Sequence, residues 1–170
     1  MLKWLGAILL SVAALLAGRY FSQNMTLRRQ ELEAVALMIG RMEDEVRYHG
    51  SDVGSLVRNM GQASFSERLP FLPACSSRCE AGEPFPDAWR SALEESAGKM
   101  HLTQEEHALL LAFGGRLGAT DLEGQLDHCA LHFKEVNRML EEARAQERVK
   151  GRLYRSLSML GCAAVIILSV

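Results

Sequence analysis

The sequence predicts an all-α protein, with a cytoplasmic bundle of about five or six helices flanked by N- and C-terminal membrane helices. Through the charged middle of the chain, apolar residues recur at spacings of three and four, and no strand-like alternation lasts. Both ends are instead uncharged and apolar, over residues 5–17 and 157–170. We therefore expect an N-terminal membrane anchor over residues 1–21, a helical domain over 22–155 and a C-terminal membrane segment over 156–170.

The two apolar ends differ in how well their lengths fit a bilayer. A bilayer core needs about 20 helical residues, which residues 1–21 supply with Lys3 and Arg19 placed at the two interfaces. Residues 156–170 give only about 22 Å of helix, so they cross with local thinning or lie partly inserted. A cleaved signal peptide fits the N-terminal pattern as an alternative, and it would leave a secreted helical domain.

Basic residues border the inner end of each apolar segment. Arg19, Arg28 and Arg29 follow the first segment, and five basic residues precede the second: Arg144, Arg148, Lys150, Arg152 and Arg155. Positive charge beside a membrane span favours the cytoplasmic side. The central domain is therefore expected in the cytoplasm, with both termini across the membrane.

Composition argues against several classes of partner and cofactor. The formal net charge is -2, with acidic and basic residues interspersed, so no basic face for nucleic acid is expected. The four cysteines are irregularly spaced, and in a reducing cytosol they should be free thiols. No cofactor or metal is predicted.

The first half of the domain reads as two helices followed by a loop. A long helix after Asn24 carries one apolar stripe and stops at Gly50, and a short helix follows over residues 51–61. The stripe consists of Leu32, Val35, Ile39, Met42 and Val46. Residues 66–86 contain all four prolines, with Cys75 and Cys79 between them, so we expect a long loop with at most one helical turn.

The second half contains clearer helix signals. Asp87 is expected to cap a helix that closes near Gly98. The segments 103–106 and 120–123, TQEE and TDLE, each match the capping box that opens a helix. No proline follows the second box, so one helix should run from there to the C-terminal apolar segment.

This last helix carries an apolar seam in one heptad frame, formed by Leu126, Cys129, Phe133, Val136, Leu140, Ala143, Tyr154 and Leu157. Glu147 and Lys150 interrupt the seam, and Gly151 is the expected bend. Packing against the first long helix of the same domain explains the seam. An intermolecular coiled coil, and hence a homo-oligomer, stays an alternative.

Two groups of side chains suggest an enzyme. His128 and His132 have the spacing of two metal ligands on one helix, with Cys129 between them, so a metal- or thiol-dependent membrane-bound enzyme is the alternative function. Neither an HExxH glutamate nor a third ligand accompanies them. Cys75 and Cys79 are separated by three residues and have no partner pair, which favours neither a zinc site nor a redox motif.

The segment 113–118, FGGRLG, is glycine-rich but differs from a phosphate-binding loop. It follows a helix and lacks the lysine and hydroxyl residue of that motif. We interpret it as a helix end and a tight turn, in which Gly114, Gly115 and Gly118 supply conformational freedom.

The whole chain resembles the stage III sporulation protein AB family. The resemblance is carried by residues 1–6 (MLKWLG), 45–48 (EVRY), 113–118 with Asp121 and Gly124-Gln125, and 150–161 (KGRLYRSLSMLG). Gly151 and Ser158 weaken the match of the last segment, and the segment with Cys75 and Cys79 matches no family pattern.

The resemblance implies a non-enzymatic membrane component of the channel between mother cell and forespore. Its helical domain would be similar to the platform (F-type) domain of type II secretion systems. The protein would lie in the mother-cell membrane facing the forespore, where it would bind the AA ATPase and other channel components. The exposed turn before the last helix is the expected partner-binding surface, with Arg116, Asp121, Glu123 and Gln125 as its candidate residues.

Overall fold

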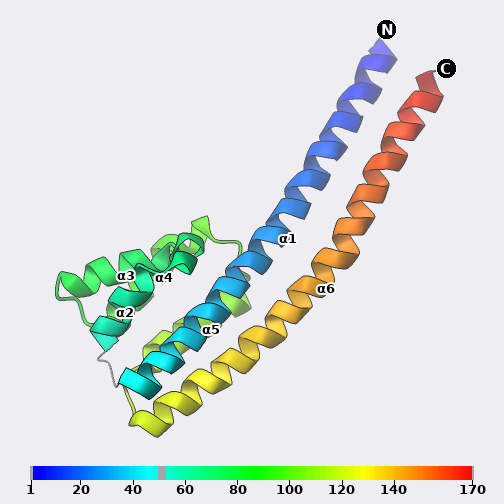
Figure 1. Ribbon diagram of the computed structural model, residues 1–170. Helices are drawn as coiled ribbons and strands as arrows, with labels where there is room; N and C mark the ends of the chain where they lie inside the picture. The colour runs from blue at the N-terminus through cyan, green and yellow to red at the C-terminus, as the bar shows by residue number, and fades with distance from the viewer. Residues whose placement is uncertain (1, 50–52, 170) are drawn as a thin grey trace. The chain divides into compact units, whose positions relative to one another are not determined.

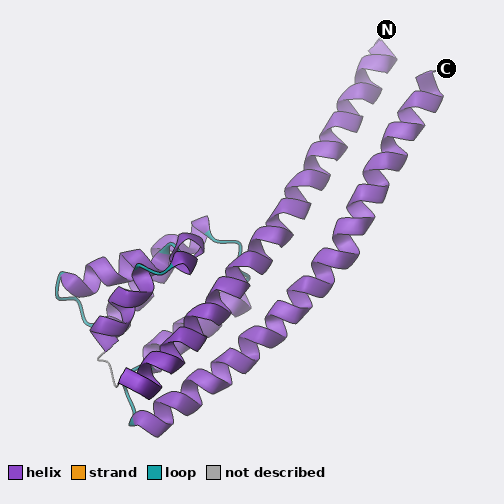
Figure 2. Cartoon of the chain, viewed as in Figure 1, coloured by secondary structure: helices purple, strands orange, loops and turns teal. Residues whose placement is uncertain are grey.

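A computed structural model describes residues 2–49 and 53–169, which are helical and contain no strand (Figures 1 and 2). In order, the elements are α1 (Leu2–His49), α2 (Val53–Gly61), the 3-10 helix η1 (Ser64–Arg68), α3 (Phe71–Glu80), α4 (Phe85–Ser96), the 3-10 helix η2 (Ala97–Lys99), α5 (Gln104–Arg116) and α6 (Leu122–Ser169). The predicted all-α class is confirmed, with six α-helices in these two ranges.

The chain divides into two compact units, and both long helices contribute to each. The bundle unit is Gln30–Glu141, and the helix-pair unit combines Met1–Arg29 with Glu142–Val170. Within the bundle unit, α3 packs on α2 and α4, and α4 packs on α5.

The core of the bundle unit forms where apolar stripes of the helices meet. The stripe predicted on the first helix is buried throughout, since Leu32, Val35, Ile39, Met42 and Val46 are at most 5% exposed. Trp89 of α4 packs edge-on against Phe71 of α3, with 5.0 Å between ring centroids. Its indole N–H donates to the carbonyl of Leu110 at 2.9 Å. The largest buried side chain is therefore both packed and satisfied in its hydrogen bonding.

The expected long loop over residues 66–86 is wrong, because most of it is helical. Pro70 is the N-cap of α3 and Pro73 lies in its first turn, while Pro84 and Pro86 take the corresponding places in α4. The first turn of a helix has no internal use for its N–H groups, so proline is tolerated there. Between the two helices, Gly82 has φ +93° and ends α3. The four prolines mark two helix starts.

Other helix boundaries confirm or shift the predictions. Thr103 and Glu106 form the predicted capping box of α5, with both reciprocal hydrogen bonds present. α4 begins two residues before Asp87, which therefore lies in the first turn and does not cap the helix. The expected stop at Gly50 falls outside the described residues.

The predicted seam of the last helix is buried over most of its described length. Cys129, Val136, Leu140 and Ala143 are at most 4% exposed, whereas Phe133 is 38% exposed. The helix continues through Gly151 without interruption. The side chains of Tyr154 and Leu157 lie outside those that the structure describes.

In the helix-pair unit, polar side chains connect α1 to α6. Glu147 accepts from the Thr26 hydroxyl at 2.7 Å and from Arg29 Nε at 2.6 Å. At the adjacent positions, Arg28 donates to the Gln146 side chain at 3.0 Å. These contacts fix the register of the two helices within this unit.

Among the residues covered by the structure, no helix is both long enough and apolar enough to span a membrane. Most side chains of the two expected membrane segments, residues 1–21 and 156–170, lie outside those described.

Candidate partner-binding surface

The turn between α5 and α6 contains the candidate residues of the sequence analysis. α5 ends at Arg116, and the Leu117 N–H then donates to the carbonyl of Gly114 at 3.3 Å. Leu117 is buried in the bundle core, at 4% exposure. Gly118 follows with φ +80°, a conformation that side-chain-bearing residues avoid. The buried leucine and the left-handed glycine together fix the path of the turn.

The three glycines of this element have different roles. A Cβ on Gly114 would lie 2.3 Å from the Trp89 indole, so Gly114 is required for close packing of α5 on α4. Gly118 is required for its positive φ. Gly115 is exposed and has open space around its Cα. Two of the three predicted structural glycines therefore have a physical reason in this fold.

The start of α6 differs from the predicted capping box by one residue. α6 begins at Leu122, and the Asp121 carboxylate accepts from the Gly124 N–H at 3.1 Å, so Asp121, and not Thr120, is the capping side chain. The predicted partner Glu123 is exposed. Sequence alone leaves this ambiguous, because threonine and aspartate are both good caps.

Structural contacts and exposure separate the four candidate binding residues. Asp121 caps α6, and the half-buried Gln125 donates from Nε2 to the carbonyl of Thr120 at 2.9 Å. Arg116 and Glu123 are exposed and form no ion pair with the residues described. Leu122, which sequence reasoning missed, is 52% exposed. A braced turn thus presents a cation, an anion and an apolar side chain to solvent.

The histidines of α6 pack against α5. His128 stacks on Phe113 with ring centroids 5.3 Å apart, and its Nε2 lies 2.9 Å from the Phe113 carbonyl oxygen. His132 Nδ1 lies 2.9 Å from the carbonyl oxygen of His128. Burial lowers the pKa of His132, the hydrogen bond to the His128 carbonyl partly opposes this shift, and the charges of His128 and Arg116 lower the pKa further. Backbone carbonyls thus engage one ring nitrogen of each histidine.

The three thiols that the structure describes are poorly suited to nucleophilic chemistry. Burial raises the pKa of the Cys129 thiol to about 11, with a smaller contribution from Glu43. Burial also raises the pKa of Cys75 far above its ordinary value, and that of Cys79 despite a hydrogen bond with Cys75. A thiol reacts as its thiolate, so all three are protonated and unreactive at neutral pH.

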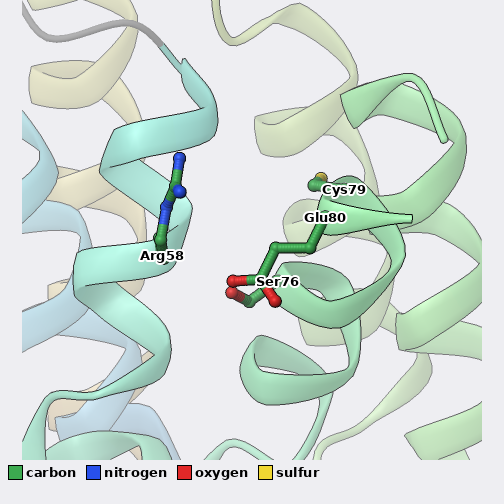
Figure 3. Close-up of a pocket in the computed structure, with 4 residues that line it drawn as sticks. All are labelled: Arg58, Ser76, Cys79 and Glu80. Atoms are coloured by element: carbon green, nitrogen blue, oxygen red, sulfur yellow. The ribbon is translucent and has the colours of Figure 1, made fainter. Parts of the chain in front are cut away.

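A shallow groove between α2 and α3 has a volume of about 200 Å³. Figure 3 shows Arg58 of α2 facing Ser76, Cys79 and Glu80 of α3 across this groove. Among the described residues, no group of three histidine, cysteine or carboxylate side chains is placed to hold a metal ion.

A contact between a buried carboxylate and a histidine inside the bundle unit was not apparent from the sequence. Glu31 of α1, only 5% exposed, accepts from the backbone N–H of His101 at 2.6 Å, and its other oxygen lies 2.8 Å from His101 Nδ1. The pair ties the segment before α5 to α1. Its members are 70 residues apart, and no local pattern marks either of them.

Comparison with known proteins places the chain in a family. The model of the stage III sporulation protein AB family matches residues 3–170. The chain belongs to the stage III sporulation protein AB family. It is 22% identical to stage III sporulation protein AB of Bacillus subtilis (strain 168) over 169 residues, which is 99% of each chain.

A solved structure of a stage III sporulation protein AB has the same fold. It superposes with a TM-score of 0.62 on 72% of this chain and 98% of its own length, at 18% sequence identity. The resemblance stated from sequence motifs is therefore confirmed at the level of the family and its helical fold.

Proposed function

We propose that the protein is a non-enzymatic membrane platform of the channel complex between mother cell and forespore, and that it docks the AA secretion-type ATPase of that complex. The observation that carries this proposal is the family match over residues 3–170, which includes both apolar ends as well as the helical domain. A role in sporulation follows from the family. Membrane anchoring and ATPase docking go beyond what family membership establishes and are the content of the proposal.

The membrane part of the proposal rests on the sequence. Residues 5–17 and 157–170 are apolar and uncharged, and basic residues border the inner end of each. This pattern is that of two membrane segments with the domain between them on the cytoplasmic side. The protein would then lie in the mother-cell membrane that faces the forespore.

The character of the side chains in the bundle unit supports binding over catalysis. The three thiols described there are protonated at neutral pH. His128 and His132 lie between α5 and α6, each with a ring nitrogen at a backbone carbonyl. Such groups stabilise a fold, and among the described residues the alternative of a metal- or thiol-dependent enzyme has no activated side chain to support it.

The α5–α6 turn is the surface that fits docking best. Its backbone is fixed by Leu117, Gly118 and the cap at Asp121, so a partner would meet a preformed surface with little ordering cost. Arg116, Leu122 and Glu123 are exposed on it. Asp121 and Gln125 serve that surface by bracing it, which is why substitution of either would mix stability with binding.

A charge swap at the turn tests docking without a change in net charge. The full-length chain with Arg116→Glu and Glu123→Lys, purified in detergent, should bind the ATPase about tenfold more weakly than the wild type, because both charges of the contact are reversed. The matched control is Asp87→Lys with Arg90→Glu, an exposed pair on α4 whose atoms are 3.5 Å apart. Equal affinity of wild type, swap and control in titration calorimetry, with equal thermal melts, would move the docking surface elsewhere.

A further inference from the structure

Charge is divided unequally between the two units. The bundle unit has 10 basic and 19 acidic residues, a net charge of -9. The helix-pair unit has 9 basic and 2 acidic residues, a net charge of +7, and together they give the chain's -2. Eight of these nine basic residues fall within residues 19–29 and 142–155, which we call the basic collar. The near-neutral total hides this separation.

Among the described residues of the basic collar, Arg19 and Arg148 differ from Arg28 and Arg29 in their contacts. Arg28 and Arg29 donate to Gln146 and Glu147 of the other helix. Arg19 on α1 and Arg148 on α6 are exposed, and neither forms a hydrogen bond or an ion pair with the residues described. The Arg28 and Arg29 contacts pair the helices, while Arg19 and Arg148 remain available to an external anion.

A hollow of about 440 Å³ lies on α1 in the turns that follow Arg19, lined among the described residues by Ser22, Gln23, Thr26 and Leu27. Ser22 and Gln23 follow Arg19 by three and four residues, so the three side chains share one face of the helix. A hydroxyl, an amide and a guanidinium group on one face provide hydrogen-bond donors for a phosphate. The hydroxyl of Thr26 is already donated to Glu147.

Two exposed aromatic residues lie between Arg19 and Ser22 in the sequence. Tyr20 is 63% exposed and Phe21 is 51% exposed, with their rings 6.1 Å apart. Exposed aromatic residues of this kind are enriched at the level of lipid headgroups. These aromatic side chains favour a phosphate that belongs to a lipid over a phosphate in solution.

We propose that the Arg19 face of α1, with Ser22 and Gln23, binds the headgroup phosphate of an anionic phospholipid, and that Arg148 reinforces this attraction from α6. This inference rests on the membrane location proposed above. Four to eight basic residues beside a membrane segment attract anionic lipid, at about fivefold in affinity for each residue near the surface. The hollow makes the contact a defined site within the collar.

The lipid retained by the purified full-length chain tests the site. The chain is incorporated into nanodiscs of equal phosphatidylglycerol and phosphatidylcholine, released into mild detergent, and its bound lipids are measured by native mass spectrometry. The wild type should retain phosphatidylglycerol in excess. Arg19→Gln should lower that excess about fivefold, and Gln23→Leu should lower it as well, because leucine has nearly the same size as glutamine but no amide donor, and the charge is unchanged.

The matched control is Arg58→Gln, which removes an exposed arginine of the bundle unit that has no ion pair among the residues described. It should retain the wild-type excess. An Arg19→Gln chain with unchanged lipid composition would overturn the proposal. A loss with Arg19→Gln but not with Gln23→Leu would also overturn it, in favour of diffuse attraction. Equal thermal stabilisation by inorganic phosphate and by phosphatidylglycerol would indicate a site for a soluble anion instead.

Failure of the membrane proposal gives a different result. Release of the wild-type chain from cell membranes by alkaline carbonate would contradict membrane anchoring, whereas the ratio of lipids bound in detergent reports on the Arg19 face alone.

Discussion

α1 and α6 each run through both units, but different forces hold them in the two places. In the bundle unit their contact faces are apolar and closed to water, as at Ile39 and Val136, which are at most 1% exposed. In the helix-pair unit the described contacts are polar and include the ion pair between Arg29 and Glu147, whose side chains are 23% and 27% exposed. A single helix can therefore be held by close apolar packing in one stretch and by ionic contacts in another. The bundle unit should be intolerant of changes in volume, and the helix-pair unit tolerant of them.

The largest effect should come from adding one methyl group to the bundle core. Gly114→Ala places a Cβ 2.3 Å from the Trp89 indole, which is itself fixed by its hydrogen bond to Leu110. Overpacking of this severity should lower the free energy of unfolding by about 3 kcal/mol. Thermal melts would measure it, with Gly115→Ala as the matched control. Gly115 has open space around it, so alanine there should stabilise by up to about 1 kcal/mol. Equal melting temperatures for the two variants would contradict the claim that close packing holds the bundle unit together.

A smaller effect is expected where the backbone, and not the core, is strained. Gly118 has φ +80°, and Gly118→Val should lower the free energy of unfolding by about 1 to 2 kcal/mol, because a β-branched residue is disfavoured there. Chemical denaturation would show this as a lower midpoint. Gly115→Val, three residues earlier in a helical conformation, should change the free energy of unfolding by less than about 0.5 kcal/mol. A Gly118→Val midpoint equal to that of the wild type would show that the turn can adopt another path.

The ionic contact of the helix-pair unit should matter less. Glu147→Gln removes the charge that accepts from Thr26 and Arg29. Since the pair is partly exposed, the loss should be about 0.5 kcal/mol and should decrease in high salt. Hydrogen exchange should speed up at amides 22–29 and remain unchanged in α3 and α4. Faster exchange throughout the bundle unit would mean that the two units are not held by separate forces.

The smallest effect concerns pH. The pKa of His132 is lowered below its ordinary value of 6.5, chiefly by burial, so the folded state binds its proton less readily than the unfolded state does. Its stability contribution is complete above 6.5 and is lost as pH falls through the lowered pKa. His132→Gln should therefore reduce the decline in melting temperature between about pH 7 and about pH 5. If the melting temperature of the variant declined as much as that of the wild type, titratable groups other than His132 would be responsible for the decline.

Sequence periodicity was sufficient for most of the bundle and failed where one residue type has two meanings. The stripe from Leu32 to Val46 identified the buried face of α1, because burial imposes the helical period directly. Proline marks loops and helix starts alike, and the local sequence around Pro70 and Pro84 does not separate the two. The correct reading required Phe71 and Trp89, whose packing holds α3 and α4 as helices.

The candidate surface was predictable in place but not in detail. The glycines and the acidic residues located the turn, yet the buried Leu117 and the exposed Leu122 look alike in the sequence. The pairing of Glu31 with His101 and the nearness of Gly114 to Trp89 depend on contacts between distant segments, which no local pattern reveals. The charge separation between the units was visible in the sequence, but only once the boundaries near Arg29 and Glu142 were known.

The most direct test of the account is whether this chain places the ATPase at the membrane through the α5–α6 turn. Sporulating cells would be fractionated, and the ATPase measured in the membrane pellet with the wild-type chain, without the chain, and with the Arg116→Glu and Glu123→Lys swap. The ATPase is expected in the pellet with the wild-type chain and strongly depleted from it with the swapped chain or without the chain, although the swapped chain sediments equally. An ATPase distribution that is the same in all three strains would contradict it.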